Sequence, residues 1–265
     1  MGMVRLGIRS PFDAPVYHKE TVGSTMDASR LLAGGGAPHG TVICADFQEA
    51  GRGRLPGRPW NAPRRDGLLF TVLLRFPGAA DIPRAITLRT GLAVALAVED
   101  LLPELAGAAR VKWPNDVMLP VRGEGGISYR KAVGILVEAS GGDVHVGIGA
   151  NVLQREFPAG LRATSLALAA GGENPDGLRF RLLEKILARL HSELAELQAS
   201  DGWRERLEAR LYMKGERIRF AEGAGSAPEL AGTLAGIGAD GELLVVPEGG
   251  AAIRAFVSGE LRPGF

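Results

Sequence analysis

An arginine- and glycine-rich loop, Gly51 to Arg58, holds the residues of this sequence best suited to bind an anion. Its eight positions contain three arginines and three glycines, directly after an apolar run. Glycines let backbone amides approach an anion closely, and guanidinium groups match carboxylate and phosphate oxygens two at a time. The composition alone also fits a solvated surface loop. The spacing is not that of a Walker A loop or a GxGxxG turn, so neither of those nucleotide-binding motifs is predicted.

A second cation that could take part in binding or catalysis is Lys112, in the segment VKWPND. It lies at the end of a predicted strand, two residues before Pro114, which cannot continue that strand. A lysine in this position can project from a rigid element into a cleft. Taken alone, the segment fits an exposed lysine at a strand end equally well.

Metal-binding and nucleophilic side chains are scarce. None of the four histidines lies in an HxxE or HExxH pattern, which argues against a histidine-held catalytic metal. The single cysteine, Cys44, excludes an internal disulfide and favours a reducing compartment. Because it lies in the apolar run TVICADF, we interpret it as a buried strand thiol. Lys and Arg total 31 against 30 for Asp and Glu, so any anion site must be local.

Neither secretion nor membrane insertion is predicted. The first seventeen residues contain no apolar core of signal-peptide length. The most apolar segment, from Ala85 to Leu105, is interrupted by Arg89, Glu99 and Asp100, so we interpret it as a buried helix. We therefore expect a cytoplasmic protein.

The elements that must position these residues alternate between strands and helices. Ser24 is a predicted cap for a short helix that ends at the glycines Gly34 to Gly36. Ser140 to Gly142 is a predicted hairpin turn, so the sheet should be mixed. We expect strands over 41–47, 67–76, 110–113, 131–139 and 143–152, and helices over 85–105, 180–197 and 203–211.

The sequence pattern changes near Met213, where short predicted strands with alternating apolar residues and glycine turns begin. Asp240-Gly241 between two such strands is a strong hairpin signal. We predict a main domain over 1–212 and a small SH3-like barrel over 213–265. A unit of this size is near the lower limit of independent stability, so it should pack on the main domain.

Together these motifs resemble the biotin–protein ligases, in the short form that lacks a DNA-binding domain. The resemblance rests on Ser24-Thr25, QEAGRGR (48–54), RPW (58–60), VKWPNDVML (111–119), KAVGILVE (131–138), VGIGANV (146–152), ATSL (163–166) and FVSGEL (256–261). It covers nearly the whole chain. The GRGR loop followed by KWPND is specific enough to outweigh the surface-loop and exposed-lysine interpretations.

The resemblance implies an α+β (α/β) fold with a mixed sheet and flanking helices, like that of class II aminoacyl-tRNA synthetases, followed by the SH3-like barrel. It implies a ligase that forms biotinyl-5′-AMP from biotin and Mg-ATP. A carrier-domain lysine, in acetyl-CoA carboxylase or a related enzyme, would then take the biotin. Only twenty-three residues precede Ser24, too few for a winged helix, so we expect no DNA binding. Both a monomer and a homodimer are compatible with the sequence.

The resemblance also assigns roles to individual residues. Arg54 and Lys112 would contact both substrates and act in catalysis together with Asp116. Magnesium would be carried by the ATP phosphates, with no dedicated protein site. The other biotin-binding residues would be Ser24, Thr25, Gln48, Gly51, Arg52 and Gly134, and the other nucleotide-binding residues would be Arg58, Trp60, Asn115 and Asn151.

These residue types suit the implied chemistry. A carboxylate must attack a phosphate that is already anionic, and two unit charges about 4 Å apart repel by roughly 4 kcal/mol at an effective dielectric near 20. A lysine and several arginines can offset this repulsion and stabilise the charge that grows at phosphorus.

The sequence departs from the family pattern in two places. Leu55-Pro56 makes the loop one residue longer than usual, and proline fixes its own φ and removes an amide. Gly23 and Met26 flank Ser24-Thr25, where an acidic residue and asparagine are common.

Two alternatives stay open, a lipoate–protein ligase and a non-catalytic biotin- or nucleotide-binding module. The first should show Arg-Arg, then triple glycine, then His-Asp, whereas here Gly34 to Gly36 precede Arg64-Arg65 and no such pair follows. Retention of Lys112 argues against the second.

Overall fold

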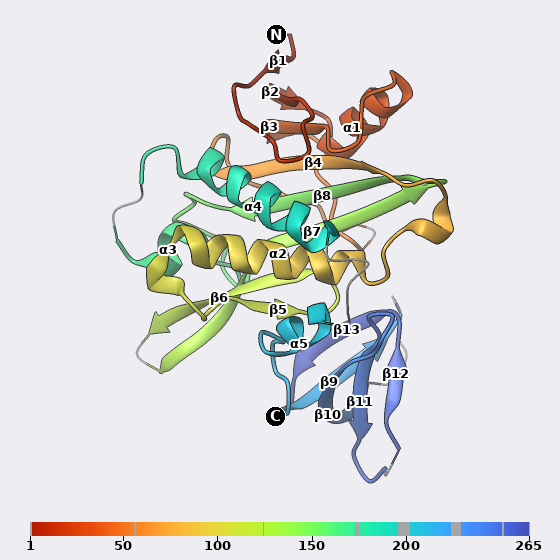
Figure 1. Cartoon of the computed structure of the whole chain (residues 1–265). Coiled ribbons are helices and arrows are strands. Elements are labelled where there is room, and N and C mark those ends of the chain that lie inside the picture. The colour runs from red at the N-terminus through yellow and green to blue at the C-terminus, as the bar shows by residue number, and fades with distance from the viewer. Residues whose placement is uncertain are drawn as a thin grey trace.

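An eight-stranded mixed sheet forms the centre of the computed structural model, which describes residues 2–55, 57–123, 125–172, 175–195, 202–223, 229–250 and 252–264 (Figure 1). The strand order is β1-β2-β3-β4-β8-β7-β6-β5, and only β2 and β3 pair in parallel. The strands are β1 (Val4–Arg5), β2 (Val16–Val22), β3 (Val42–Gln48), β4 (Gly67–Arg75), β5 (Arg110–Lys112), β6 (Asp116–Gly123), β7 (Gly126–Ser140) and β8 (Asp143–Asn151). The predicted mixed sheet is confirmed.

The two faces of this sheet differ because side chains alternate along each strand. One face carries large apolar residues that belong to the main core, such as Phe70 on β4 and Val146 on β8. The neighbouring positions Thr71, Gly147 and Gly149 point to the opposite face. The sequence thus places a packed core on one side and small or polar residues on the other.

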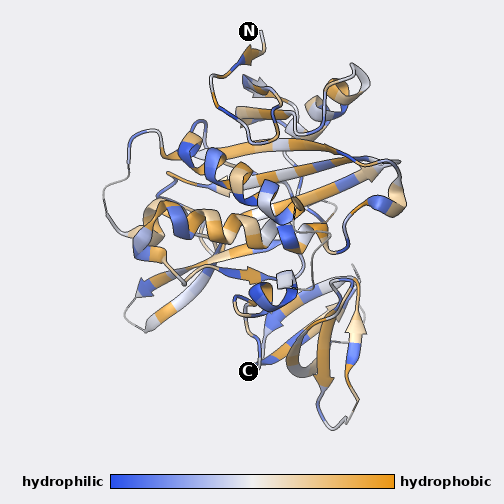
Figure 2. Ribbon diagram, in the orientation of Figure 1, coloured by the Kyte–Doolittle hydropathy of each residue, from blue (hydrophilic) through white to orange (hydrophobic). Residues whose placement is uncertain are grey.

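Two long helices, α2 (Ile86–Leu101) and α4 (Leu178–Ala195), lie side by side across the apolar face (Figure 1). Figure 2 shows the apolar stripe of α4 alternating with polar positions, as expected for a helix that covers a sheet. The helix predicted to reach Leu105 ends earlier. Leu102 leaves the helical conformation and Pro103 begins a short 3₁₀ turn, consistent with proline disfavouring a helical residue before it.

The remaining helices are short. α1 (Thr25–Gly34) packs against β3, β4 and β8, and α3 (Leu166–Ala170) and α5 (Gly202–Glu208) connect larger elements. Leu197, predicted within the helix over 180–197, lies outside the described residues. No helix in the described part of the chain is long and apolar enough to cross a membrane.

A second sheet is built from the C-terminal strands, in the antiparallel order β12-β11-β10-β9-β13. Its strands are β9 (Arg217–Glu222), β10 (Leu230–Ile237), β11 (Leu243–Pro247), β12 (Arg254–Phe256) and β13 (Gly259–Pro263). The short strands predicted after Met213 and the turn predicted at Asp240-Gly241 are confirmed. The described strands form an open sheet, since β12 and β13 do not pair with each other.

Trp113 joins the two sheets. Its indole Nε1 donates a hydrogen bond of 3.0 Å to the carbonyl oxygen of Gly241, and its ring packs 5.9 Å from that of Phe220. Trp113 directly follows Lys112, so the strand end that carries the predicted catalytic lysine is anchored against the C-terminal sheet.

The prediction for Cys44 is confirmed. Its side chain is buried on β3, and its thiol lies 3.2 Å from the carbonyl oxygen of Tyr17. Burial raises the pKa of Cys44 to about 12, so the thiol stays protonated and is not a nucleophile.

Candidate functional site

Three glycines on the polar face of the main sheet form the floor of the candidate site. A Cβ atom at Gly134 or Gly149 would lie 2.7 or 2.6 Å from ring atoms of Trp60, and one at Gly147 would lie 2.6 Å from Sδ of Met26. Real Cβ atoms essentially never come this close, so only glycine lets these side chains lie flat on β7 and β8. The motifs KAVGILVE and VGIGANV therefore supply a platform.

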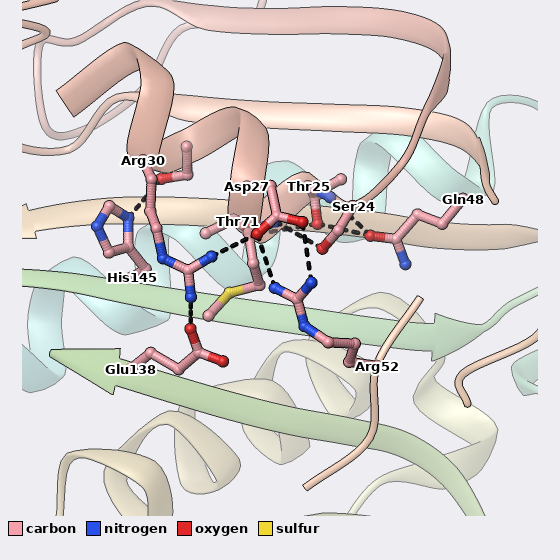
Figure 3. A network of polar contacts seen from close by, with 11 residues as sticks. Ser24, Thr25, Asp27, Arg30, Gln48, Arg52, Thr71, Glu138 and His145 are labelled. Carbon is pink, nitrogen blue, oxygen red and sulfur yellow. Dashed lines mark hydrogen bonds and ion pairs between the residues drawn. The ribbon is translucent and has the colours of Figure 1, made fainter. Parts of the chain in front are cut away.

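Beside the platform, the N-terminus of α1 presents a set of hydrogen-bonding groups (Figure 3). Ser24 caps the helix, with its hydroxyl accepting from the amide of Met26 at 3.2 Å. The side-chain oxygen of Gln48 accepts from both the amide and the hydroxyl of Thr25, at 2.8 and 3.0 Å. The hydroxyl of Thr71 donates to that of Thr25 at 2.9 Å. These contacts fix the positions of neutral donors and acceptors before any ligand binds.

The arginine-rich loop forms a narrow turn over the site. Arg52 and Pro59 form an isolated antiparallel bridge, the Gly53 amide donates to the Arg58 carbonyl at 2.8 Å, and the Trp60 amide donates to the Gly51 carbonyl at 3.0 Å. Pro56 lies outside the described residues.

The three arginines of the loop reach different parts of the molecule. Arg52 pairs with Asp27 of α1 through two bonds of 2.9 Å. Arg54 donates to the carbonyl oxygen of Gly259 at 2.9 Å, and Arg58 pairs with Glu260 at 2.6 Å. The loop is thus held to α1 on one side and to β13 of the C-terminal sheet on the other.

Two adjoining cavities meet at this loop. The inner pocket, of about 50 Å³, is lined by Ser24, Thr25, Met26, Gln48, Arg52, Gly53, Arg54, Trp60, Asn115, Lys131, Gly134, Ile135, Leu136, Gly147, Ile148 and Gly149. The outer cleft, of about 1350 Å³, is lined by 53–55, 57–63, 112–116, 131, 151, 154, 156–158, 161, 163 and 260–262. Gly53, Arg54, Trp60, Asn115 and Lys131 line both, so they form the shared wall.

Lys112 lies in the outer cleft, at the end of β5. Burial lowers the pKa of Lys112, an effect that the carboxylate of Asp116 opposes and the ammonium of Lys131 reinforces. Within the described part of the chain, its ammonium forms no hydrogen bond or ion pair. A desolvated cation without a partner is well placed to bind an anionic ligand.

Asn115 and Asn151 reach the cleft while holding the backbone around it. The Asn115 amide donates to the Ile135 carbonyl at 2.9 Å, and the Asn151 amide donates to the Thr164 carbonyl at 3.0 Å. Both side-chain nitrogens are therefore engaged. Each residue retains a side-chain oxygen that can accept a bond from a ligand.

The sequence reasoning missed Lys131 as a site residue. Its ammonium lies 2.6 Å from the carboxylate of Asp116 and 5.4 Å from the ring centroid of Trp60, in a cation–π arrangement. The available signal was the KAVGILVE motif, whose first residue is Lys131. The pairing itself depends on the register between β6 and β7, which shifts between Val117 and Met118.

The structure brings together nearly all the predicted site residues. The inner pocket is lined by six of the residues predicted to bind biotin: Ser24, Thr25, Gln48, Arg52, Arg54 and Gly134. The outer cleft is lined by Arg54, Arg58, Trp60, Lys112, Asn115, Asp116 and Asn151. Gly51 lines neither cavity. A Cβ there would lie 2.4 Å from the carbonyl oxygen of Trp60, so this glycine permits the close approach of the two loop arms.

No group of three or more histidine, cysteine, aspartate or glutamate side chains in the described residues could hold a metal ion. The arrangement is instead that of an anion site with cations on the loop, on β5 and on β7. Its chemistry is electrostatic, with neutral hydrogen-bonding groups on one side and positive charge on the other.

Comparison with known proteins identifies the family of the chain. A model of the Biotin/lipoate A/B protein ligase family matches residues 21–152. The biotin–protein ligase of Aquifex aeolicus, solved in complex with biotin and ATP, superposes with a TM-score of 0.75 at 30% identity, over 94% of this chain and 99% of that one.

Curated relatives are also similar in sequence. The biotin–[acetyl-CoA-carboxylase] ligase of Mycobacterium tuberculosis is 32% identical over 205 residues, covering 76% of this chain and 71% of that protein. The bifunctional ligase/repressor BirA of Bacillus subtilis is 38% identical over 166 residues, or 59% of this chain and 47% of BirA. The chain thus spans about half the length of this relative and of the one from Bacillus spizizenii, 51% of which is covered. The chain belongs to the biotin/lipoate A/B protein ligase family.

Proposed function

We propose that this protein is a biotin–protein ligase, which activates biotin as biotinyl-5′-AMP and transfers it to a lysine of a biotin carboxyl carrier domain. The observation that carries the proposal is the junction of two unlike cavities at one cationic wall. A pocket with neutral hydrogen-bonding groups suits the ureido ring of biotin, and a large cationic cleft suits a nucleotide. The similarity to a ligase solved with biotin and ATP supports both assignments.

In this proposal biotin binds in the inner pocket. Ser24, Thr25 and Gln48 offer the donors and acceptors that a ureido group needs, and the glycine platform leaves room for a flat bicyclic ring. Arg52 closes the open side of the pocket. The carboxylate of biotin then extends past Arg54 toward the outer cleft.

The first reaction takes place where the pocket meets the cleft. A carboxylate oxygen of biotin attacks the α-phosphorus of ATP, the bond to the bridging oxygen breaks, and pyrophosphate leaves with the electron pair. Lys112 and Arg54 offset the repulsion between the two anions and stabilise the charge that grows in the transition state. Trp60, Asn115, Asn151 and Arg58 bind the nucleotide.

Magnesium would reach the site on the phosphates of ATP, where it neutralises the departing pyrophosphate.

The second reaction releases AMP. The amine of the carrier lysine attacks the biotinyl carbonyl, the bond to the phosphate oxygen breaks, and the amine loses a proton. We assign Asp116 a positioning role in this step, because Lys131 already neutralises its carboxylate at 2.6 Å. The name of the Mycobacterium tuberculosis relative supports acetyl-CoA carboxylase as the source of the carrier.

We further propose that residues 1–212 form the catalytic domain and residues 213–265 an SH3-like unit that completes the cleft. The contacts from Arg54 and Arg58 to β13 support this division of labour.

An ATP–pyrophosphate exchange assay tests the proposed function. We expect exchange that depends on biotin and is not supported by lipoate, followed by biotin transfer to a carrier domain. Exchange with lipoate alone would identify a lipoate ligase. Tight binding of biotin without any exchange would identify a non-catalytic module.

A further inference from the structure

A network of alternating charges runs from β7 across α1 to the edge of the inner pocket, and Arg52 is its one member already assigned to a substrate (Figure 3). Its order is Arg52, Asp27, Arg30 and Glu138. Arg52 pairs with Asp27 through both terminal nitrogens at 2.9 Å, Asp27 also pairs with Arg30, and Arg30 pairs with Glu138 on β7. The network therefore joins the arginine-rich loop to β7 through α1.

Local sequence explains why α1 can serve as this bridge. Ser24 caps the helix, so Asp27 is its third residue and lies in the first turn, where a carboxylate is favoured by the helix dipole. Arg30 follows three residues later and so projects from the same face of the helix. One face of α1 thus presents a carboxylate to the loop and a guanidinium to β7.

The geometry of the first link is suited to orienting a side chain. A carboxylate that accepts from both terminal nitrogens of an arginine fixes the plane of the guanidinium as well as its position. Such a pair uses one hydrogen on each of the two nitrogens, so Arg52 keeps further N–H donors for a ligand. Asp27 can hold Arg52 without occupying its whole binding capacity.

We propose that Asp27 is a positioning residue, which holds Arg52 at the mouth of the inner pocket and is itself held by Arg30 and Glu138. The proposal rests on the proposed function in so far as the ligand is biotin. Asp27 touches no substrate. The carboxylate of Asp27 lowers the entropic cost of biotin binding, because Arg52 is already oriented when the ligand arrives.

The alternative is that Asp27 only stabilises the helix. The charges of this network are partly exposed, with 50% of the Asp27 side chain and 40% of the Arg52 side chain accessible. Ion pairs with this exposure add little to the free energy of folding. A helix-stabilising role would therefore change the melting temperature slightly and leave ligand affinity alone. A positioning role changes affinity.

Calorimetric titration of the full chain with biotin separates the two roles. We expect Asp27→Asn to weaken biotin binding about three- to tenfold, on the scale of one ordinary net hydrogen bond, and Asp27→Glu to restore most of the loss. In an Arg52→Ala background, Asp27→Asn should cause no further loss, because the interaction that it removes is already gone.

Asp100→Asn is the matched control. Asp100 forms a similar two-bond pair with Arg189, at 2.6 and 2.7 Å, between α2 and α4 on the far face of the sheet. It should leave biotin affinity unchanged. Wild-type affinity in Asp27→Asn, or equal losses with and without Arg52, would overturn the proposal. Should Asp27→Asn fail to fold, Glu138→Gln removes the charge at the far end of the same network. It should cause a smaller loss of biotin affinity.

Hydrogen exchange at the amides of Gly53 and Trp60 provides a readout that needs no biotin. Both amides are bonded within the loop, and Asp27→Asn should speed their exchange about three- to tenfold relative to Asp100→Asn. If the wild-type protein does not bind biotin but this difference is found, the proposed function fails and the positioning of the loop stands. If exchange is unchanged, the positioning proposal fails whatever the ligand is.

Discussion

The inner pocket and the outer cleft share a wall but are built in different ways. The inner pocket draws its residues from the N-terminus of α1, neighbouring strands of one sheet and the loop, and its polar groups bond to one another, as in the contact between Thr25 and Gln48. The outer cleft is assembled from the loop, the turn after β5 and the C-terminal strand β13. It also contains Lys112, whose side chain is half-buried. In the proposed function, this difference suits the pocket to a neutral ring and the cleft to an anion.

This difference predicts that the two cavities can be disabled separately. The largest effect should come from Lys112→Ala, which removes the cation at the reacting phosphate. We expect adenylate formation to fall by about 10²- to 10³-fold, on the scale of other preorganised electrostatic groups. Biotin affinity should change little, because Lys112 does not line the inner pocket. Pyrophosphate exchange and calorimetry on the same preparation measure both quantities, and a parallel loss in both would break the proposed separation.

Arg54→Gly should have the next largest effect, on retention of the intermediate. Arg54 lies in the shared wall, and its loss removes a charged donor from the adenylate and a 2.9 Å contact with β13. We expect biotinyl-5′-AMP to dissociate about ten- to a hundredfold faster, as for loss of a charge-assisted hydrogen bond, and to label bystander proteins. Arg64→Gly, which removes an arginine outside both cavities, is the control. Unchanged retention and acceptor selectivity would refute a latch role.

Gly149→Ala should affect both substrates together, because it acts on the shared wall. The new methyl group would lie 2.6 Å from the Trp60 ring, and overpacking of this kind costs about 1–3 kcal/mol. We expect biotin affinity and the KM for ATP each to worsen by at least about fivefold. Gly123→Ala, where nothing lies within 4 Å of the added carbon, should be neutral. A change confined to one substrate would show that Trp60 does not serve both cavities.

The smallest change is a shift in a pH profile. Because burial lowers the pKa of Lys112 below its ordinary value of 10.5, the active ammonium should be lost as the pH rises through that lowered value. The kcat/KM for pyrophosphate exchange, which reports the free enzyme, should therefore fall on the alkaline side below pH 10.5. Lys112→Arg should move this limb to higher pH, since guanidinium stays charged. An identical limb in both proteins would assign it to another group.

Local patterns predicted the elements of the fold better than their pairing. The apolar stripe of α4, the cap at Ser24 and the turn at Gly141-Gly142 all correspond to features of the structure. β6, which begins at the last residue of the KWPND motif, was not predicted as a strand; it contains Pro120, a residue that is rare inside strands. Sequence alone does not specify which strands become neighbours, so the central place of β8 between β4 and β7 could not be read from it.

The candidate site shows the same limit. Residue types and motif order identified the arginines of the loop and Lys112, because their chemistry is local to each motif. The contacts of Asp27 with Arg52 and of Lys131 with Asp116 join segments 25 and 15 residues apart, and they depend on helix placement and strand register. The motifs that contain these residues are visible in the sequence, but the pairings between them carry no local signal and emerged only from the structure.

A crystal structure with bound biotinyl-5′-adenylate would test most directly that one cavity binds biotin and the other the nucleotide. We expect the bicyclic ring in the inner pocket beside Thr25 and Gln48, the adenosine in the outer cleft, and Nζ of Lys112 within hydrogen-bonding distance of the phosphate. Adenosine in the inner pocket, or a phosphate remote from Lys112, would contradict this division.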